Sequence, residues 1–242
     1  MGMSSTYLIV AGWGFGPQAL APLADALRTP DVDVEATSIC ALTDSHGSAE
    51  LHTRLTGHDT VLVVWSMAAL VALEGLCETP DTMPRKIVLL SPTARFCATE
   101  GYTFGAPARA LRAQQRALSR DPDTALTAFI DAVFAPHSIS GAERAALLSD
   151  AKTLAPASLE TGLQYLGNTD LRERLSASSS SHLHVIHGEA DAIIPPAAGR
   201  EVAERCGASF ELLPGQGHGF PIHAATETAE RIRAIVNAGD WA

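Results

Sequence analysis

Short apolar runs alternate with helical patterns along most of the chain. Runs rich in β-branched and other apolar residues occupy positions 7–10, 34–39, 60–65, 87–90, 182–186 and 209–212. Between them, apolar residues recur at helical spacing over positions 18–27, 67–76, 198–205 and 224–236. Strands that alternate with helices, several of them apolar throughout, predict an α/β protein with a mainly parallel sheet and helices on both faces.

One stretch, residues 102–175, breaks this alternation. It holds helical patterns at 106–118, 124–134, 142–148 and 158–166 and no convincing strand. A block of helices inserted between two strands of a parallel sheet indicates a cap over the carboxyl ends of the strands, where ligands bind in such folds. We therefore expect a core formed by residues 1–101 and 176–242 and an inserted helical cap, or lid, formed by residues 102–175.

The composition narrows the class of protein. Of 242 residues, 46% are hydrophobic and 18% are charged, which favours one large folded domain over disorder. The formal charge of −10 argues against a general nucleic-acid binder. No apolar run is long enough to span a membrane, the N-terminus lacks a signal-peptide pattern, and the four widely spaced cysteines suit a reducing compartment. We expect a soluble, cytoplasmic monomer that binds neither nucleic acid nor membrane.

Three polar residues follow expected strands in the order serine, acid, histidine. Ser66 comes directly after the run 60–65 and opens a helical pattern, Asp191 follows the run 182–186, and His218 lies in a glycine-flanked loop after the run 209–212. A serine hydroxyl needs a base to become a nucleophile, and the base needs an orienting carboxylate. Each residue alone could be structural, but together they predict Ser66 as nucleophile, His218 as base and Asp191 as acid.

Two backbone amides complete the expected site. The glycine-rich turn after the first strand aims the N–H of Trp13 at the oxyanion, and the N–H of Met67, at a helix N-terminus, points into the same space. We also expect the Trp13 indole to line the pocket for the acyl chain. Glu189 competes with Asp191 for the acid role; we favour Asp191 because its short side chain is followed by apolar residues that would bury it.

These residues resemble the motifs of a known family. AGWG, WSM, SPTARF, HGEAD and GHGF look like the α/β-hydrolase superfamily, and more narrowly like the pimeloyl-[acyl-carrier protein] methyl ester esterases of biotin synthesis. Two cap segments, QQRALSRD and GLQYLGNTDLRERL, extend the resemblance over most of the chain. It implies an α/β-hydrolase fold and hydrolysis of the methyl ester of pimeloyl-acyl carrier protein, with Gln114 and Leu118 in contact with substrate. We expect no metal or organic cofactor.

The resemblance is incomplete around the oxyanion turn and the nucleophile. Ala11 replaces a histidine that often precedes the glycine, and Val64 and Ala68 replace both glycines of the usual G-x-S-x-G pattern. A β-branched residue such as Val64 needs local room at a strained turn. Two alternatives therefore stay open. One is a general short-chain carboxylesterase, thioesterase or carbon–carbon bond hydrolase with the same triad, and the other is a non-catalytic binding module of this fold.

Four arginines of the expected cap share one helix face. Arg109, Arg112, Arg116 and Arg120 are spaced by three, four and four residues, and we refer to them as the arginine stripe. Such a run is commonly a solvated helix face. It would also suit docking of an acidic acyl carrier protein, raising the association rate more than the affinity, and the family resemblance favours this second interpretation.

The segment HLHVIHG raises the question of a metal site. His182 and His184 share one face of the expected strand, whereas His187 falls on the other face. Three ligands cannot converge on one ion from that arrangement unless the strand bends, so we predict no metal site here.

Overall fold

The computed structural model describes residues 5–40, 60–84, 86–176 and 183–238. Within them, six strands form one parallel sheet in the order β2-β1-β3-β4-β5-β6. All six expected strands are confirmed, with ends that shift by one or two residues; His182, expected to open the fifth strand, lies outside the described residues. The strands are β1 (Ser5–Ala11), β2 (Val32–Ser38), β3 (Thr60–Trp65), β4 (Lys86–Leu90), β5 (Leu183–Gly188) and β6 (Ser209–Leu213).

The apolar run of β3 follows from its place inside the sheet. Its neighbours are β1 and β4, and Val64 lies opposite Val10 on one side and Leu89 on the other. Because alternate side chains of a strand point to opposite faces, a strand covered on both faces needs apolar residues throughout. Residues 61–65 are all buried, as this position requires.

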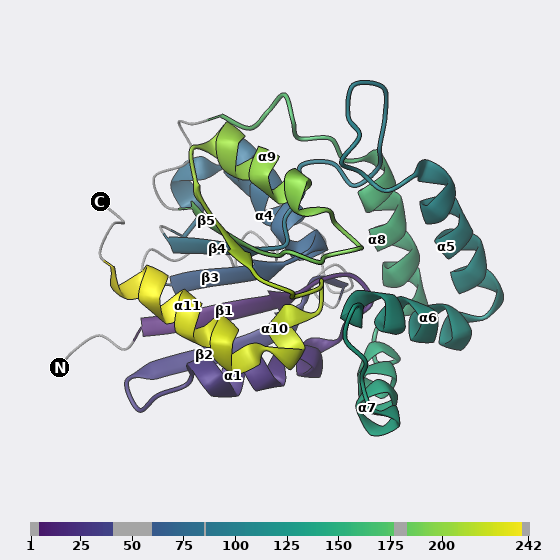
Figure 1. The fold of residues 1–242 in the computed structure, drawn as a ribbon, viewed down its shortest axis with the longest axis horizontal. Helices are drawn as coiled ribbons and strands as arrows, with labels where there is room; N and C mark the ends of the chain where they lie inside the picture. Colours follow the sequence, from purple (N-terminus) through teal and green to yellow (C-terminus); the bar gives the residue numbers. More distant parts are fainter. Residues whose placement is uncertain (1–4, 41–59, 85, 177–182, 239–242) are drawn as a thin grey trace.

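Helices cover both faces of the sheet (Figure 1). One face, which carries Leu62 and Leu89, packs against α4 and α9, and the opposite face, which carries Val63 and Ile186, packs against α1, α10 and α11. These helices are α1 (Ala21–Leu27), α4 (Met67–Glu78), α9 (Pro196–Cys206), α10 (Phe220–His223) and α11 (Ala225–Asn237), with short 3-10 helices η1 (Pro17–Leu20) and η2 (Pro80–Thr82). The expected mainly parallel, doubly covered sheet is therefore confirmed.

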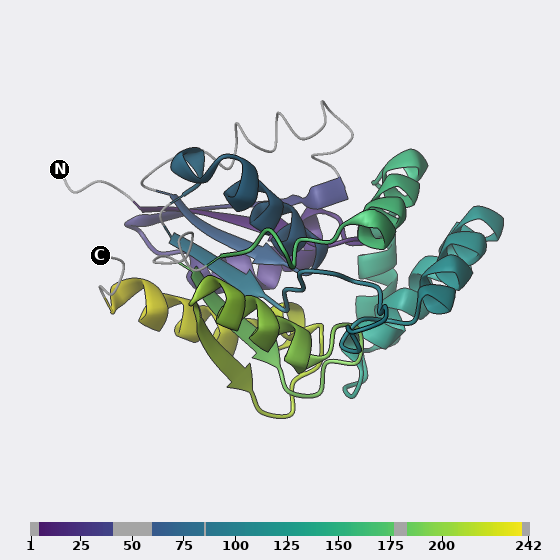
Figure 2. The same ribbon diagram turned by 90° about the horizontal axis from the view of Figure 1, so that it is seen from above.

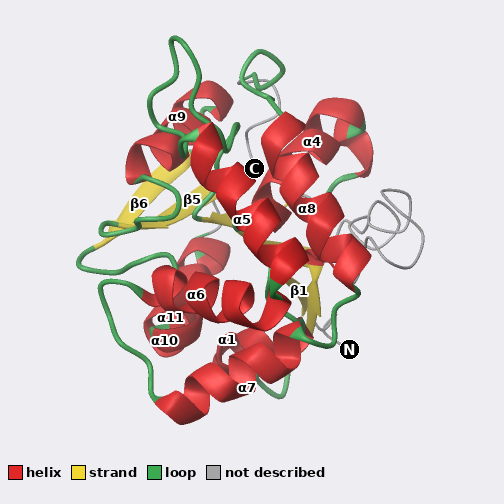
Figure 3. Cartoon of the chain, turned by 90° about the vertical axis from the view of Figure 1, so that its right-hand side faces the viewer, coloured by secondary structure: helices red, strands yellow, loops and turns green. Residues whose placement is uncertain are grey.

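Four further helices separate β4 from β5 along the chain and gather at one end of the sheet. They lie on the right in Figures 1 and 2 and face the viewer in Figure 3. A capping box between Ser140 and Glu143 starts the third of them. Among the described residues, no helix combines the length and apolar character that crossing a membrane requires. The four are α5 (Ala108–Arg120), α6 (Pro122–Phe134), α7 (Gly141–Ala151) and α8 (Pro156–Asn168).

Specific contacts join two of these helices, α7 and α8, to the segment that follows β1. The Trp13 indole Nε1, after β1, donates a hydrogen bond to the Leu159 carbonyl of α8 at 2.8 Å. A Cβ atom on Gly162 of α8 would lie 2.6 Å from the same indole, so only glycine allows this approach. The Asp150 carboxylate of α7 accepts a hydrogen bond from the Ala19 N–H at 2.9 Å. Helices α7 and α8 are thereby fixed against the segment at the carboxyl end of β1.

Candidate active site

Ser66 occupies the sharp turn between β3 and α4. Its φ is 59° and its ψ is −120°, and its N–H donates a hydrogen bond to the Leu90 carbonyl at 2.9 Å. A positive φ in a residue with a side chain persists only where the surroundings enforce it. Gly12 gives this turn its room, because a Cβ atom there would lie 2.8 Å from the Ser66 Cβ and 2.9 Å from the Trp65 carbonyl oxygen. The β1 loop can therefore approach the serine closely.

The structure brings Ser66, His218 and Asp191 together. Nε2 of His218 lies 3.0 Å from Oγ of Ser66, and Nδ1 of His218 lies 2.7 Å from Oδ2 of Asp191. His218 is 1% exposed and Asp191 is 5% exposed. With Nδ1–H donating to the carboxylate, Nε2 is left to accept the serine proton. The arrangement can thus move a proton from the hydroxyl to the imidazole.

Asp191 is held by groups on three segments. Its Oδ1 accepts hydrogen bonds from the N–H groups of Ile193 and Ile194, both at 2.9 Å, and its Oδ2 accepts one from the Ser91 hydroxyl at 2.7 Å. Nε2 of the fully buried His187 lies 3.3 Å from the same Oδ2. Sequence reasoning assigned no role to Ser91 or His187. Both residues lie at the carboxyl ends of strands, β4 and β5, and such ends meet at one edge of a parallel sheet. This position is the feature of the sequence that could have indicated their proximity to the site.

The charge of Asp191 follows from these neighbours. Burial alone would raise the pKa of its carboxyl, but electrostatic attraction to His218 and hydrogen bonds from His187 and His218 hold that pKa well below the ordinary value. Asp191 is therefore ionised, as an orienting carboxylate has to be. Glu189, the competing acid, is exposed and accepts a hydrogen bond from the Gly215 N–H at 2.9 Å instead. The geometry favours Asp191.

The loop that carries His218 is fixed from two sides. The Trp65 indole Nε1 donates a hydrogen bond to the His218 carbonyl at 3.1 Å. On the other side, the Gly219 N–H donates to the Val133 carbonyl, near the end of α6, at 2.9 Å. Gly217 is pressed against the Ala135 carbonyl and leaves no space there for a side chain. The imidazole is thus positioned by both β3 and α6.

The two expected oxyanion donors remain candidates for that role. Met67 is the first residue of α4, so its N–H has no acceptor within the helix. Trp13 follows Gly12, the residue that touches Ser66. In the described part of the chain, neither N–H is engaged by a backbone acceptor. Both amides are therefore free to donate to a substrate oxygen.

A cavity of about 430 Å³ opens at Ser66 under α5, α6 and α8. Of its described lining residues none is charged, and the polar side chains are few: Ser66, Trp13 and Gln114. Leu118 does not line this cavity and lines a separate one beside Leu126, so its expected contact with substrate stays a prediction. The reason is helix geometry: Leu118 shares a face with Leu111, which does reach the cavity, but lies about 10 Å further along the axis at roughly 1.5 Å per residue.

The arginine stripe lies on the outer face of α5. All four side chains are exposed, whereas Leu111 and Leu118 on the opposite face are buried. Among the described residues, none of the four arginines forms an ion pair. The stripe is therefore an exposed, positively charged surface.

The histidines of β5 are engaged separately. His184 contacts the Ser209 hydroxyl and His187 lies beside Asp191, while His182 falls outside the described residues. Across the residues that the structure describes, no group of three or more His, Cys, Asp or Glu side chains is placed to hold a metal ion.

Comparison with known proteins identifies the family. A model described as the alpha/beta hydrolase family matches residues 5–231. The chain therefore belongs to the alpha/beta hydrolase family. Together with the esterases described below, this match identifies it as a carboxylic ester hydrolase.

Curated relatives carry one more specific name. A pimeloyl-[acyl-carrier protein] methyl ester esterase from Aromatoleum aromaticum is 30% identical over 216 residues, covering 82% of this chain and 84% of the relative. An esterase of the same name from Nitrosospira multiformis is 29% identical over 164 residues; the match covers 66% of this chain and 62% of that relative's length.

Solved structures share the fold. An esterase from Exiguobacterium antarcticum has a TM-score of 0.83 at 15% identity and covers 98% of this chain and 93% of its own. A bromoperoxidase from Bacillus anthracis has a TM-score of 0.83 at 18% identity, with 97% and 92% covered. At these identities the likeness establishes the fold alone.

Proposed function

We propose that this esterase hydrolyses the methyl ester of pimeloyl-acyl carrier protein, releasing methanol and the free carboxylate. The observation that carries the proposal is the hydrogen-bonded series from Ser66 Oγ through His218 to Asp191, at the floor of an uncharged cavity. Relatives named for this reaction support the choice of substrate.

The chemistry runs through an acyl-enzyme. His218 Nε2 takes the proton of the Ser66 hydroxyl as Oγ attacks the ester carbonyl, and the N–H groups of Trp13 and Met67 donate to the oxyanion. Protonated His218 then gives its proton to the departing methoxide, which leaves as methanol. Water attacks the acyl-enzyme with His218 again as base, and Ser66 is regenerated.

The lining of the cavity at Ser66 supports a substrate whose acyl chain is uncharged and whose ester end lies at the serine. Apolar side chains such as Phe96, Leu163 and Leu166 surround the space above Ser66. A free carboxylate buried there would lack a cation and would carry the cost of desolvation. The methyl ester of a pimeloyl chain attached to its carrier has no such charge. The outer rim is formed by small exposed residues, through which the chain would leave: Pro107, Ala110, Ala128, Ala132 and Ala192.

The arginine stripe supports a carrier protein as partner. Acyl carrier proteins are acidic, and four unpaired guanidinium groups on α5, next to the rim, would steer such a partner toward the cavity. Replacing Arg109, Arg116 and Arg120 by serine should then lower kcat/KM for the carrier-bound ester without affecting small esters. Equal effects on both substrates would favour a solvated helix face.

The decisive experiment compares three substrates: pimeloyl-acyl carrier protein methyl ester, dimethyl pimelate and p-nitrophenyl butyrate. We expect the highest kcat/KM for the carrier-bound ester and a loss of about 10⁶-fold in kcat for Ser66→Ala on all three. Equal or better turnover of the free esters would reduce the proposal to a general carboxylesterase. Wild-type inactivity toward every ester, together with no Ser66-dependent labelling by a fluorophosphonate, would favour a binding module.

A further inference from the structure

A second cavity lies across Leu111 from the cavity at Ser66. It has a volume of about 300 Å³ and is bounded by the segment before α5, by α5 itself and by α8. Its polar lining consists of two arginines and three amides, Arg95, Arg112, Gln115, Gln164 and Asn168. Among the described residues, no aspartate or glutamate lines it. A cavity with cations, amide donors and no carboxylate is suited to an anion.

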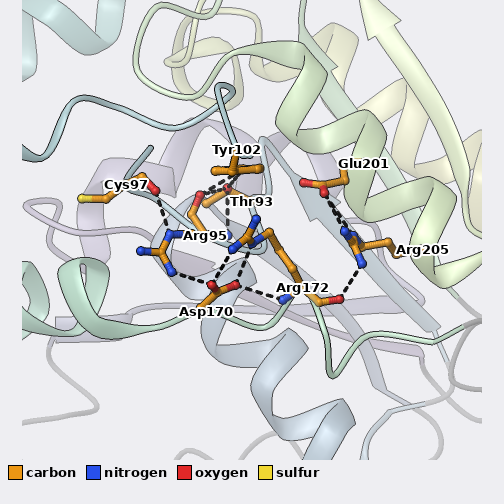
Figure 4. A network of polar contacts seen from close by, with 8 residues as sticks. All are labelled: Thr93, Arg95, Cys97, Tyr102, Asp170, Arg172, Glu201 and Arg205. Atoms are coloured by element: carbon orange, nitrogen blue, oxygen red, sulfur yellow. Dashed lines mark hydrogen bonds and ion pairs between the residues drawn. The ribbon is translucent and has the colours of Figure 1, made fainter. Parts of the chain in front are cut away.

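Arg95 is fixed in place by the network shown in Figure 4. Its Nε donates to the Cys97 carbonyl at 2.9 Å, and its Nη1 donates to Asp170. Asp170 is in turn held by Arg172, whose Nε and Nη2 donate at 2.9 and 2.8 Å. A guanidinium that is already oriented loses little entropy when it binds a ligand, so its remaining N–H donors are preorganised.

The charges around this cavity do not cancel. Hydrogen bonds from Arg172, and to a lesser degree from Arg95, hold the pKa of Asp170 well below its ordinary value, so this carboxylate carries one negative charge. It pairs with Arg95, which lines the cavity, and with Arg172, which does not, and exposed Arg112 adds a second lining guanidinium across the cavity. In a chain with a formal charge of −10, this is a local excess of positive charge.

We propose that the second cavity binds the phosphate of the carrier protein's 4′-phosphopantetheine arm. The proposal rests on the proposed function and concerns the part of the substrate beyond the acyl chain. Arg112 belongs both to the arginine stripe and to this cavity, so it lies between the carrier's surface and the arm.

The route between the two cavities is short. Pro107 lines the cavity at Ser66 and the next residue, Ala108, lines the second cavity. An arm that leaves the acyl cavity can therefore pass over the first turn of α5 and reach the arginines. Guanidinium forks match phosphate oxygens in pairs, and the amides of Gln115, Gln164 and Asn168 add neutral donors.

The test uses two small thioesters of monomethyl pimelate, one with pantetheine and one with 4′-phosphopantetheine. At constant ionic strength, we expect the phosphate to raise kcat/KM of the wild type about tenfold, mainly through KM. Arg112→Gln should abolish this advantage, and Arg112→Lys should restore part of it. Arg231→Gln, which removes an exposed arginine from the distant α11, is the matched control for net charge and should keep the full advantage.

Equal kcat/KM for the two thioesters in the wild type, or an unchanged ratio in Arg112→Gln, would overturn the phosphate site and leave the esterase proposal intact. If neither thioester releases methanol, the proposed function fails instead. The phosphate site is then judged by nuclear magnetic resonance titration of Ser66→Ala with 4′-phosphopantetheine, pantetheine and inorganic phosphate. Tighter binding of 4′-phosphopantetheine than of both others supports the site; equal binding of inorganic phosphate indicates a general anion site and contradicts it.

Discussion

The indole of Trp65 donates a hydrogen bond to the carbonyl of His218, at 3.1 Å, across 153 positions of sequence. The centroids of the indole ring and the imidazole ring also lie 5.4 Å apart. The residue immediately before the candidate nucleophile therefore holds the loop that carries the candidate base. β3 thus positions both partners of the proton transfer.

Trp65→Phe should keep an aromatic ring at this position but lose the hydrogen bond to the His218 carbonyl. The His218 carbonyl would be left without its donor, which costs about 1–3 kcal/mol of unfolding free energy for a buried group. We expect kcat toward p-nitrophenyl butyrate to fall about tenfold with little change in KM, since the loop would lose alignment. Steady-state kinetics and urea unfolding measure the two effects. A kcat equal to that of the wild type would show that α6 alone positions the loop.

Gly12→Ala should disable the site by steric overlap. The new Cβ would lie 2.8 Å from the Ser66 Cβ, so either the serine turn or the β1 loop has to move. A displacement of about 1 Å at the reacting atoms can cost on the order of 100-fold in rate. Gly141→Ala is the matched control, because a Cβ at that helix position meets nothing within 4 Å. Similar activity in the two variants would contradict the prediction.

Val64→Gly tests whether this chain needs the usual glycine before its serine. Val64 is 1% exposed and packs in the core, so its removal leaves a cavity and should cost about 2–4 kcal/mol of unfolding free energy. We expect no gain in kcat for the folded enzyme, since Ser66 already adopts its positive φ beside valine. A clear rise in kcat would instead mean that Val64 restrains the turn.

Asp191→Asn should lower kcat about 10⁴-fold at neutral pH because the imidazole loses its orienting carboxylate. The pKa of Asp191 is lowered in the folded protein, so its ionisation stabilises the fold at pH values above the unfolded value of about 3.9. That contribution is lost as the pH falls through the folded pKa. Urea unfolding should therefore show a stability difference between wild type and variant that narrows below about pH 4. A difference that stays constant with pH would contradict this assignment.

Monomethyl pimelate should be a poorer substrate than dimethyl pimelate. The two differ by one negative charge, and the described lining of the cavity at Ser66 contains no cation to bind it. We expect kcat/KM to differ at least tenfold at neutral pH, measured as methanol release. Equal rates at neutral pH would place a cation within reach of the chain.

Much of the fold could be predicted because several strands, such as β3, are apolar throughout and alternate with helical patterns. In a parallel sheet all carboxyl ends meet at one edge, so Ser66, Asp191 and His218, each placed after a strand, were expected to converge. Their distances agree with that expectation, while their catalytic roles and the boundaries of the cap at residues 102 and 175 stay predictions.

Other parts of the site depend on packing that spacing does not reveal. The bond from Ser91 to Asp191 requires β4 and β5 to be neighbours, which only the strand order determines. Leu118 and Gln114 are one helical turn apart in sequence, and only Gln114 lines the cavity, because the cavity ends before Leu118 along the axis of α5. In the sequence, Gly162 looks like any other helix glycine. The need for a glycine there comes from the Trp13 indole, which packs against it in the fold.

The hydrogen bond from Gly219 to Val133 has a consequence for how substrate gains access. It makes the last turn of α6 a fixed wall of the site, because a hinge motion there would pull the neighbouring His218 away from Ser66. On the α5 side of the rim, which carries Ala110, no hydrogen bond among the described residues joins the helix to the loop of His218. Widening on that side alone would admit a long acyl chain while the proton relay stays assembled.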